Sequence, residues 1–280
     1  MSVSIKEELD GSEFRESETI AFDIETEGFA GANGDEVTVI GLYPDSSEDT
    51  PVFLINTKGK DIDKRELWEN CNDFPMAAKV VVYETECTLL DVGFRSFIES
   101  LNTYDQRLCG YNAETWSGGF DIPFLRTRFM NHSIEWYLDG VYYVDILTEV
   151  QKHINTVEPL FKTLSEDEQE QFKEEFNYSD EDIIAEDITD NLESFGETTG
   201  YNVYGDNNGL DEAHEVLCDC GVDDPYESSK QAVEDYENGV IAPVIYHCYT
   251  DVVRTKCMFD LVMAYTPARE PSELKDSGYI

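Results

Sequence analysis

The sequence predicts an α/β fold in which helices flank a mixed central sheet. Three short apolar runs with brief connections open the chain, and this pattern is typical of an antiparallel meander. Helical and strand patterns then alternate, which is typical of parallel strands joined by helices. Hydrophobic residues make up 41% of the 280 positions and aromatic residues 12%, so the chain can bury a sizeable core. We therefore expect three antiparallel strands followed by parallel strands.

The expected strands are short stretches rich in apolar residues. The first three span 19–26, 36–43 and 51–56, and turns with glycine, proline or acidic residues connect them. Further strands are expected at 79–83, 107–111 and 141–145. Residues 57–78 are polar, and we expect them to be irregular.

Four stretches carry helical patterns. Apolar residues recur at helical spacing over 85–101. Phe120 begins another helix, with Pro123 in its first turn, where no backbone donor is needed. Residues 209–217 and 241–265 show the same periodicity, and the last of these predicts the longest helix.

These elements are expected to form one domain over residues 19–265. An acidic segment, 1–18, precedes it with Phe14 as its anchor, and a polar tail, 266–280, follows it. The most acidic part, at about 148–206, is expected to be a folded helical insertion. Its helix signals are the capping pairs Ser165 with Glu168 and Ser179 with Asp182, and the apolar positions Phe172, Phe176, Ile184, Ile188, Leu192 and Phe195.

The charge of the chain is extreme. There are 61 acidic residues against 19 Lys plus Arg, which gives a net charge of −42 spread along the whole sequence. Such self-repulsion destabilises a compact state at low salt, and molar salt screens it. We therefore expect a salt-adapted protein, as in halophilic archaea or their viruses. The alternative is a nucleic-acid mimic that occupies a basic partner.

Cysteine usage and hydropathy point to a cytoplasmic protein. The seven cysteines are odd in number, and their spacing matches no zinc pattern, with Cys218 and Cys220 forming only a lone pair. Reduced and mostly buried thiols are expected. No apolar run has membrane-spanning length, and the first residues lack a signal-peptide pattern, so we expect no membrane partner.

Asp23 and Glu25 follow the apolar run Ile20-Ala21-Phe22 in the first strand. Side chains two apart on a strand point to the same face, so these two acids project together. Like charges side by side repel unless a cation neutralises them, and oxygen ligands favour magnesium or manganese. The alternative is a surface strand with two solvated acids.

Two further acids complete a candidate site. Asp121 stands at the start of an expected helix, and Asp251 lies within the last one. Taken alone, Asp121 or Asp251 could equally be an acid that caps a helix or one that faces solvent. Together with Asp23 and Glu25 they provide four carboxylates, enough to hold two metal ions about 4 Å apart for an in-line phosphoryl displacement.

The order of these motifs resembles the DEDD 3′–5′ exonuclease superfamily. FDIET (Asp23, Glu25), GYN with FDIPFL (Asn112, Asp121) and HCYTDVVRT (Asp251) resemble its three motifs, and the resemblance runs from about 19 to 260. The chain is most similar to the proofreading-exonuclease domains of family-B DNA polymerases and their stand-alone relatives. The resemblance implies a ribonuclease-H-like fold, two Mg²⁺ or Mn²⁺ ions, and hydrolysis at the 3′ end of single-stranded or frayed DNA. It also implies a role in DNA replication or repair, with proteins of those processes as partners.

The sequence departs from the family in the residue expected to act as base. One branch of the family has Tyr four residues before the last Asp and the other has His five before, whereas here His247 stands at minus four and Tyr246 at minus five. A residue four earlier lies about 40° from Asp251 around a helix, and one five earlier about 140° away. We therefore expect His247 to orient or deprotonate the attacking water. The alternative is a packed His247, with Tyr246 or Tyr249 in that role.

The seven-residue spacer between Asn112 and Phe120 is longer than usual for the family and contains Trp116. Trp116 is expected to stack on a base of a single strand, and Phe29 is a weaker candidate. Basic residues near the motifs, Arg126, Arg128 and Arg254, are expected to contact nucleic acid. Asp145 is expected either to support the metal site or to cap a helix.

Three other functions remain open from the sequence. One is an exonuclease that acts on RNA in place of DNA, because the motifs do not distinguish the two substrates. The second is a non-catalytic nucleic-acid-binding module on a nuclease fold, and the third is an acidic DNA mimic. The presence of all four acids disfavours the last two.

Overall fold

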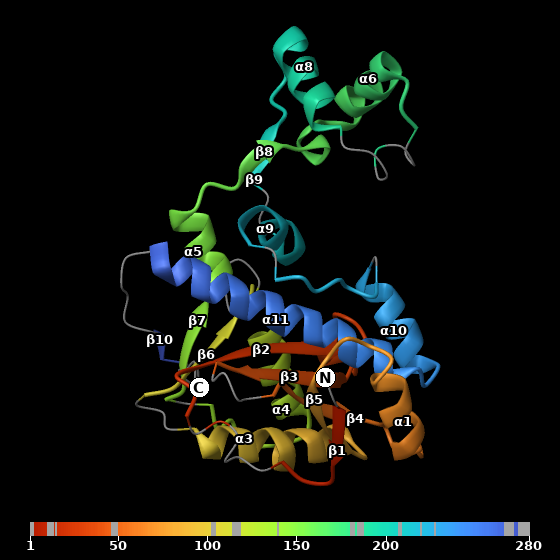
Figure 1. Ribbon diagram of the computed structural model, residues 1–280, viewed down its shortest axis with the longest axis vertical. Coiled ribbons are helices and arrows are strands. Elements are labelled where there is room, and N and C mark those ends of the chain that lie inside the picture. The colour runs from red at the N-terminus through yellow and green to blue at the C-terminus, as the bar shows by residue number, and fades with distance from the viewer. Residues whose placement is uncertain are drawn as a thin grey trace.

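A mixed sheet forms the centre of the molecule (Figure 1). In this computed structural model the described residues are 3–9, 14, 16–45, 50–101, 105–113, 119–138, 140–179, 183, 188–206, 209–218, 220–226, 228–265 and 272–273. Among them, eight strands pair in the order β1-β5-β4-β3-β2-β6-β7-β10. Their bounds are β1 (Val3–Lys6), β2 (Thr19–Thr26), β3 (Val37–Pro44), β4 (Val52–Asn56), β5 (Ala78–Tyr83), β6 (Arg107–Gly110), β7 (Tyr142–Asp145) and β10 (Ser272–Glu273). Several expectations fall outside the described residues, namely those for Trp116, Asp182, Ile184 and most of the tail 266–280.

The pairing confirms the predicted mixture of antiparallel and parallel strands. β2, β3 and β4 form the antiparallel meander, while β6 pairs in parallel with β2 and β7 pairs in parallel with β6. On the other side, β5 pairs in parallel with β4. The chain is therefore an α/β protein with a mixed sheet.

The first and last strands were not expected from the sequence. β1 pairs in parallel with β5, and the carbonyl of Val3 accepts a hydrogen bond of 2.8 Å from the indole of Trp68. The segment 1–18 thus contributes a strand to the sheet, while Phe14 is fully buried, as expected, and packs on Phe97 at a ring distance of 4.7 Å. β10 pairs antiparallel with β7 from within the stretch expected to be a tail.

Helices cover both faces of the sheet (Figure 1). Their bounds are α1 (Lys64–Cys71), α2 (Glu86–Thr88), α3 (Arg95–Ser100), α4 (Asp121–Asn131), α5 (Ile146–His153), α6 (Glu166–Phe176), α8 (Thr189–Thr199), α9 (Leu210–Leu217), α10 (Ser229–Glu237) and α11 (Ile241–Tyr265). Shorter turns are η2 (Gly31–Asn33), the π-helical η3 (Leu89–Phe94) and η4 (Phe161–Thr163). None of the described helices is both long and apolar enough to cross a membrane.

The expectation that residues 57–78 are irregular is wrong, because α1 lies within them. Asp63 caps this helix, and its carboxylate accepts a hydrogen bond of 2.8 Å from the backbone of Arg65. Only Leu67 and Cys71 of the helix are buried. So narrow an apolar stripe gives little periodic signal in the sequence.

The alternation of side chains along β2 assigns its residues to two different layers. Ile20, Phe22 and Ile24 pack into the core beneath α3 and α4. Ala21 packs into the opposite core, which is built largely on α11. Asp23 and Glu25 share the face of Ala21, because residues two apart point the same way. The strand therefore directs both acids toward α11.

α11 lies very close to the sheet at Gly41 of β3. A Cβ atom at Gly41 would come within 2.6 Å of the Cys248 sulfur and 2.9 Å of Val252 Cγ1. Only glycine avoids these contacts without moving the helix. This close approach brings the carboxylates of α11 within reach of those of β2.

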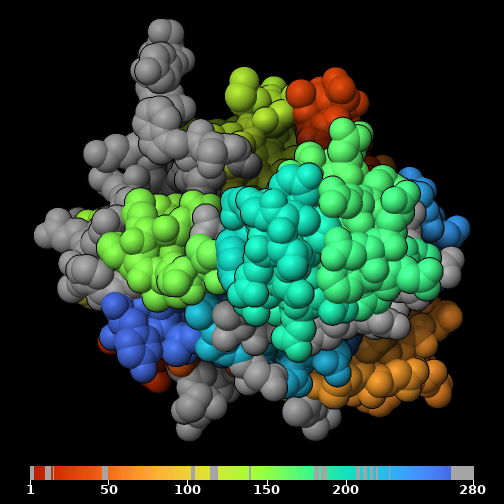
Figure 2. Space-filling view, turned by 90° about the horizontal axis from the view of Figure 1, so that it is seen from above, coloured from red at the N-terminus to blue at the C-terminus, as the bar shows by residue number. Residues whose placement is uncertain are grey.

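The insertion has a small core of its own. Strands β8 (Val157–Pro159) and β9 (Tyr204–Asp206) pair antiparallel at its base, and α6 and α8 project beyond them (Figure 1). Seen from above, the green and cyan segments of the insertion face the viewer (Figure 2). Its buried residues are Leu164, Phe172, Ile188, Leu192, Phe195 and Val203. Ser165 and Glu168 form the predicted capping box. The insertion was expected to begin at about residue 148. Residues 148–153 instead belong to α5, and Val150 of this helix packs in the main core under α11, so the insertion begins after α5.

Arg128 does not face the nucleic-acid surface predicted for it. Its guanidinium is buried and paired with the buried carboxylate of Glu86 at 2.6 Å, and it donates to the carbonyl of Gly31 at 2.8 Å. Glu86 also accepts a hydrogen bond of 2.7 Å from the backbone of Val37. The pair therefore ties α4 to α2 and β3, and the expectation that Arg128 contacts nucleic acid is wrong.

Arg128→Met should lower the free energy of unfolding by about 3–5 kcal/mol, because it leaves a buried carboxylate without its main partner. Arg126→Met on the same helix is the control. Arg126 is half-buried over the ring of Trp136 at 5.3 Å, so its loss should cost only about 0.5–1 kcal/mol. Urea unfolding in molar potassium chloride measures both. Equal losses for the two variants would contradict a structural role specific to Arg128.

Candidate functional site

A cleft of about 380 Å³ opens beside the end of β2. All four predicted carboxylates line it, together with His247. Asp23 and Glu25 come from β2, Asp121 is the first residue of α4, and Asp251 lies on α11. Three segments that are far apart in the sequence thus bring their acids to one place.

The carboxylates destabilise one another's charged forms. Burial raises the pKa of Asp23 well above its usual value, and the charges of Asp121 and Asp251 raise it further. Burial is also the main cause that raises the pKa of Asp121, followed by the charge of Glu25. For Glu25, burial raises the pKa, His247 opposes this, and Asp23 adds to it. A cluster of this kind favours the binding of a cation, since a cation offsets the repulsion.

His247 faces this cluster, as its helical spacing predicts. Its Nε2 atom lies 3.7 Å from Oε1 of Glu25 and 3.9 Å from Oδ2 of Asp251. Tyr246 faces away and stacks on Phe74 at a ring distance of 4.7 Å. Tyr249 stacks on Tyr246 at 5.7 Å, so both tyrosines belong to the packing of the helix.

Asp224, which the sequence analysis did not single out, holds the other nitrogen of His247. Nδ1 of the ring donates to Oδ2 of Asp224 at 2.8 Å and lies 2.9 Å from Oδ1. Nη1 of Arg254 lies 3.7 Å from Asp224 and 3.9 Å from Asp251, which places this predicted residue at the site, behind the carboxylates. Asp224 is one of 61 acids and precedes α10 in a loop, so no sequence pattern distinguishes it.

These neighbours determine the charge of His247. Burial alone lowers its pKa, but Glu25, the hydrogen bond to Asp224 and the charge of Asp251 outweigh burial and raise the pKa to about 10. The ring is therefore protonated at neutral pH when no cation is bound. Its positive charge then partly offsets the acids around it.

Asn112, Asp145 and Arg126 lie outside the cleft lining. Asn112 is exposed, with a left-handed backbone (φ 57°), and its backbone N–H donates to Asp145 at 3.0 Å. Asp145 also caps α5 by accepting from the backbone of Leu147 at 3.2 Å, and its charge raises the pKa of Asp121. Arg126 packs over Trp136 on the side of α4.

Two aromatic rings stand at the edge of the cleft. Phe29 is 85% exposed, and its ring lies 5.6 Å from that of Phe120 in an edge-to-face contact. Lys230 of α10 also lines the cleft and brings a cation to it. Phe22, by contrast, is fully buried in the core.

Two sets of potential metal ligands lie within the site. Asp23, Glu25 and Cys248 offer atoms within 4.8 Å of one another, and so do Glu25, His247 and Asp251. The thiol of Cys248 donates to Oδ2 of Asp23 at 3.7 Å. Carboxylate oxygens predominate, and such hard ligands suit magnesium or manganese.

Comparison of the sequence with protein-family models and with curated proteins finds no match.

Proposed function

We propose that this chain is a metal-dependent 3′–5′ exonuclease that releases nucleoside monophosphates from single-stranded or frayed DNA ends. The observation that carries the proposal is the meeting of Asp23, Glu25, Asp121 and Asp251 in one cleft. The sheet supports it, since an antiparallel meander joined to parallel strands is compatible with a ribonuclease-H-like fold. The three sequence motifs that resemble the DEDD superfamily all reach this cleft or its edge.

The chemistry of the side chains in the cleft suits divalent metal ions. The potential ligand atoms are mainly carboxylate oxygens. Burial and mutual repulsion destabilise the charged form of these carboxylates, and a bound cation would relieve that repulsion. Asp23, Glu25, Asp121 and Asp251 would hold Mg²⁺ or Mn²⁺. When bound, such ions activate a water molecule and stabilise the oxygens of an in-line phosphoryl displacement.

His247 is the group in the cleft best suited to hold the proton of the attacking water. Asp224 fixes its ring through Nδ1, which leaves Nε2 directed at the cleft. The raised pKa of this ring depends on the charges of Glu25 and Asp251. Neutralising those charges lowers the pKa, so that Nε2 can accept a proton at neutral pH.

A single strand would bind mainly by stacking and by contacts with the ions. Phe29 presents an exposed ring beside Phe120 at the edge of the cleft, and every base has a face that can stack on it. Lys230 is placed to contact a phosphate. Counterion release contributes little in concentrated salt, which suits a chain with so few basic residues.

Digestion of a 5′-labelled single-stranded oligonucleotide tests the function. With manganese or magnesium we expect a ladder that shortens from the 3′ end and stops when a chelator is added. A phosphorothioate at the last 3′ linkage should delay the ladder, and a matched RNA oligonucleotide shows whether the sugar matters. Binding of the oligonucleotide without any cleavage would favour a non-catalytic module.

We also propose that the protein is adapted to high salt and works in a DNA replication or repair setting in such a cell. Its melting temperature should fall progressively on dialysis from molar potassium chloride into dilute buffer, because screening of its 61 acids is lost. Scanning calorimetry at several potassium chloride concentrations measures this. An unchanged melting temperature would count against salt adaptation and would favour a nucleic-acid mimic.

A further inference from the structure

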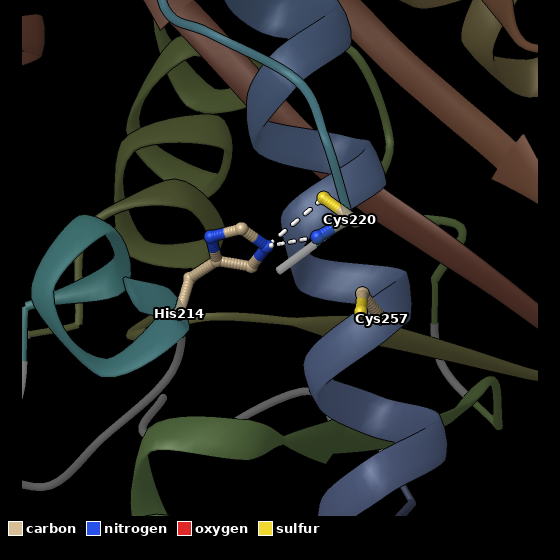
Figure 3. Close-up of side chains that lie close together, drawn as sticks. All are labelled: His214, Cys220 and Cys257. Carbon is tan, nitrogen blue, oxygen red and sulfur yellow. Dashed lines mark hydrogen bonds between the residues drawn. The ribbon is translucent and has the colours of Figure 1, made fainter. Parts of the chain in front are cut away.

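A second cluster of potential metal ligands lies along α11, apart from the cleft. It consists of His214 on α9, Cys220 in the loop that follows, and Cys257 on α11 (Figure 3). The ring nitrogen of His214 and the two sulfur atoms all lie within 4.8 Å of one another. None of these three residues lines the cleft. Their separation along the sequence follows no recognised metal motif, so the fold alone brings them together.

The spacing of the ligand atoms suits a tetrahedral ion. Zinc binds sulfur at about 2.3 Å and imidazole nitrogen at about 2.0–2.1 Å, which places tetrahedral ligand atoms about 3.5–3.8 Å apart. Here Nε2 of His214 lies 2.9 Å from the sulfur of Cys220, and the largest spacing in the cluster is within 4.8 Å. To admit the ion, the His214 and Cys220 ligand atoms must move apart by about 0.6 Å.

The histidine presents the nitrogen that an ion needs. The backbone N–H of Cys220 donates to Nε2 of His214 at 3.2 Å, so this nitrogen carries a lone pair and not a proton (Figure 3). The imidazole is buried, which restricts its orientation. Binding of an ion would replace this hydrogen bond by a coordinate bond. Cys220 and Cys257 are both free thiols and half-buried, so neither sulfur is committed to a disulfide.

We propose that His214, Cys220 and Cys257 bind one zinc ion, with water in the fourth position. Thiolate and imidazole ligands select zinc, whereas the oxygen ligands of the cleft select magnesium or manganese. The ion joins α9 and the loop after it to α11. The same loop continues to Asp224, which orients His247. Zinc therefore fixes the segment that positions the histidine of the cleft.

Cobalt(II) is the probe for this site. Thiolate ligation gives cobalt a charge-transfer absorption in the near ultraviolet and strong visible bands when the site is tetrahedral, whereas carboxylate ligation gives neither. The reduced full-length protein, titrated in molar potassium chloride, should develop these bands and saturate at one cobalt per chain. One equivalent of zinc should then remove them.

Variants connect the signal to the three residues. His214→Gln and Cys257→Ser should each weaken cobalt binding by at least about 100-fold, because each removes one ligand. Cys87→Ser removes an exposed thiol on α2 and should leave the titration unchanged. Asp23→Asn should also leave it unchanged, which separates this site from the cleft set of Asp23, Glu25 and Cys248. Zinc should raise the melting temperature of the wild type by roughly 5–10 °C, but not that of Cys257→Ser.

Two results would overturn the proposal. One is the absence of thiolate bands from the reduced wild type. The other is retention of wild-type bands and affinity by both His214→Gln and Cys257→Ser. Circular dichroism of each variant shows whether it has folded, and the wild-type titration decides the matter even if a variant has not.

Discussion

Asp121→Asn should reduce nuclease turnover by at least about 1,000-fold, because it removes one charged ligand while keeping the shape of the side chain. Asp121 is buried at the start of α4, and no other described acid of that helix lines the cleft. The control is Asp260→Asn, which removes an exposed acid on α11 that pairs with Lys256 at 2.5 Å. Single-turnover digestion with saturating manganese should show the control within about twofold of the wild type.

The same variant should be more stable than the wild type in chelator at neutral pH. Folding raises the pKa of Asp121, so the metal-free protein loses stability as the pH rises above the range in which an unfolded aspartate titrates. The asparagine variant has no such loss, and the difference should vanish at low pH, where the carboxyl group is protonated in both states. Manganese should stabilise the wild type more than the variant. Near-normal turnover in Asp121→Asn together with unchanged manganese binding would contradict the two-ion assignment.

His247→Ala should lower turnover by roughly 100-fold to 10,000-fold and leave manganese binding intact, since the four carboxylates remain. Its Nε2 atom is the ring nitrogen 3.7 Å from Glu25 and 3.9 Å from Asp251. Tyr246→Phe should be nearly silent, because that ring stacks on Phe74 behind the helix. Single-turnover digestion of a labelled single strand measures both variants. An active His247→Ala beside a crippled Tyr246→Phe would transfer the role of base to the tyrosine.

Asp224→Asn separates a positioning role from a purely structural one. Asp224 helps to raise the pKa of His247, so its replacement should shift the acidic limb of the pH–rate profile to lower pH. A purely structural loss would lower the rate at every pH without moving that limb.

The sheet could be predicted largely because its strands are buried and therefore apolar. The apolar run Ile20-Ala21-Phe22 is typical of a buried strand. The sequence of β4, whose five residues are all buried, shows the same kind of apolar run. The sequence did not predict β1 or α1, because each element buries too few apolar residues to produce a periodic pattern. Their stability depends on neighbours such as β5 and Trp68, which only the folded chain brings to them.

The carboxylates of the site could be predicted because local sequence determines their direction. Alternation on β2 places Asp23 and Glu25 together, and four-residue spacing on α11 places His247 beside Asp251. Asp224 could not be predicted, since its partner lies 23 positions away and its own segment has no regular structure. Arg128 was misassigned because a basic residue that pairs with a buried acid looks the same in sequence as one that binds phosphate.

The contact between Cys248 and Asp23 joins residues 225 positions apart in the chain. Contacts of such separation form slowly, because a long loop must close before they contribute any stability. A chain emerging from the ribosome exposes β2 long before α11 exists, and Ala21, Asp23 and Glu25 then lack their cover. In the nascent protein, Asp23, Glu25 and the apolar sheet face around them therefore stay exposed to solvent until α11 docks. Assembly of the carboxylate cleft and protection from aggregation are therefore expected to occur together, in one late folding step.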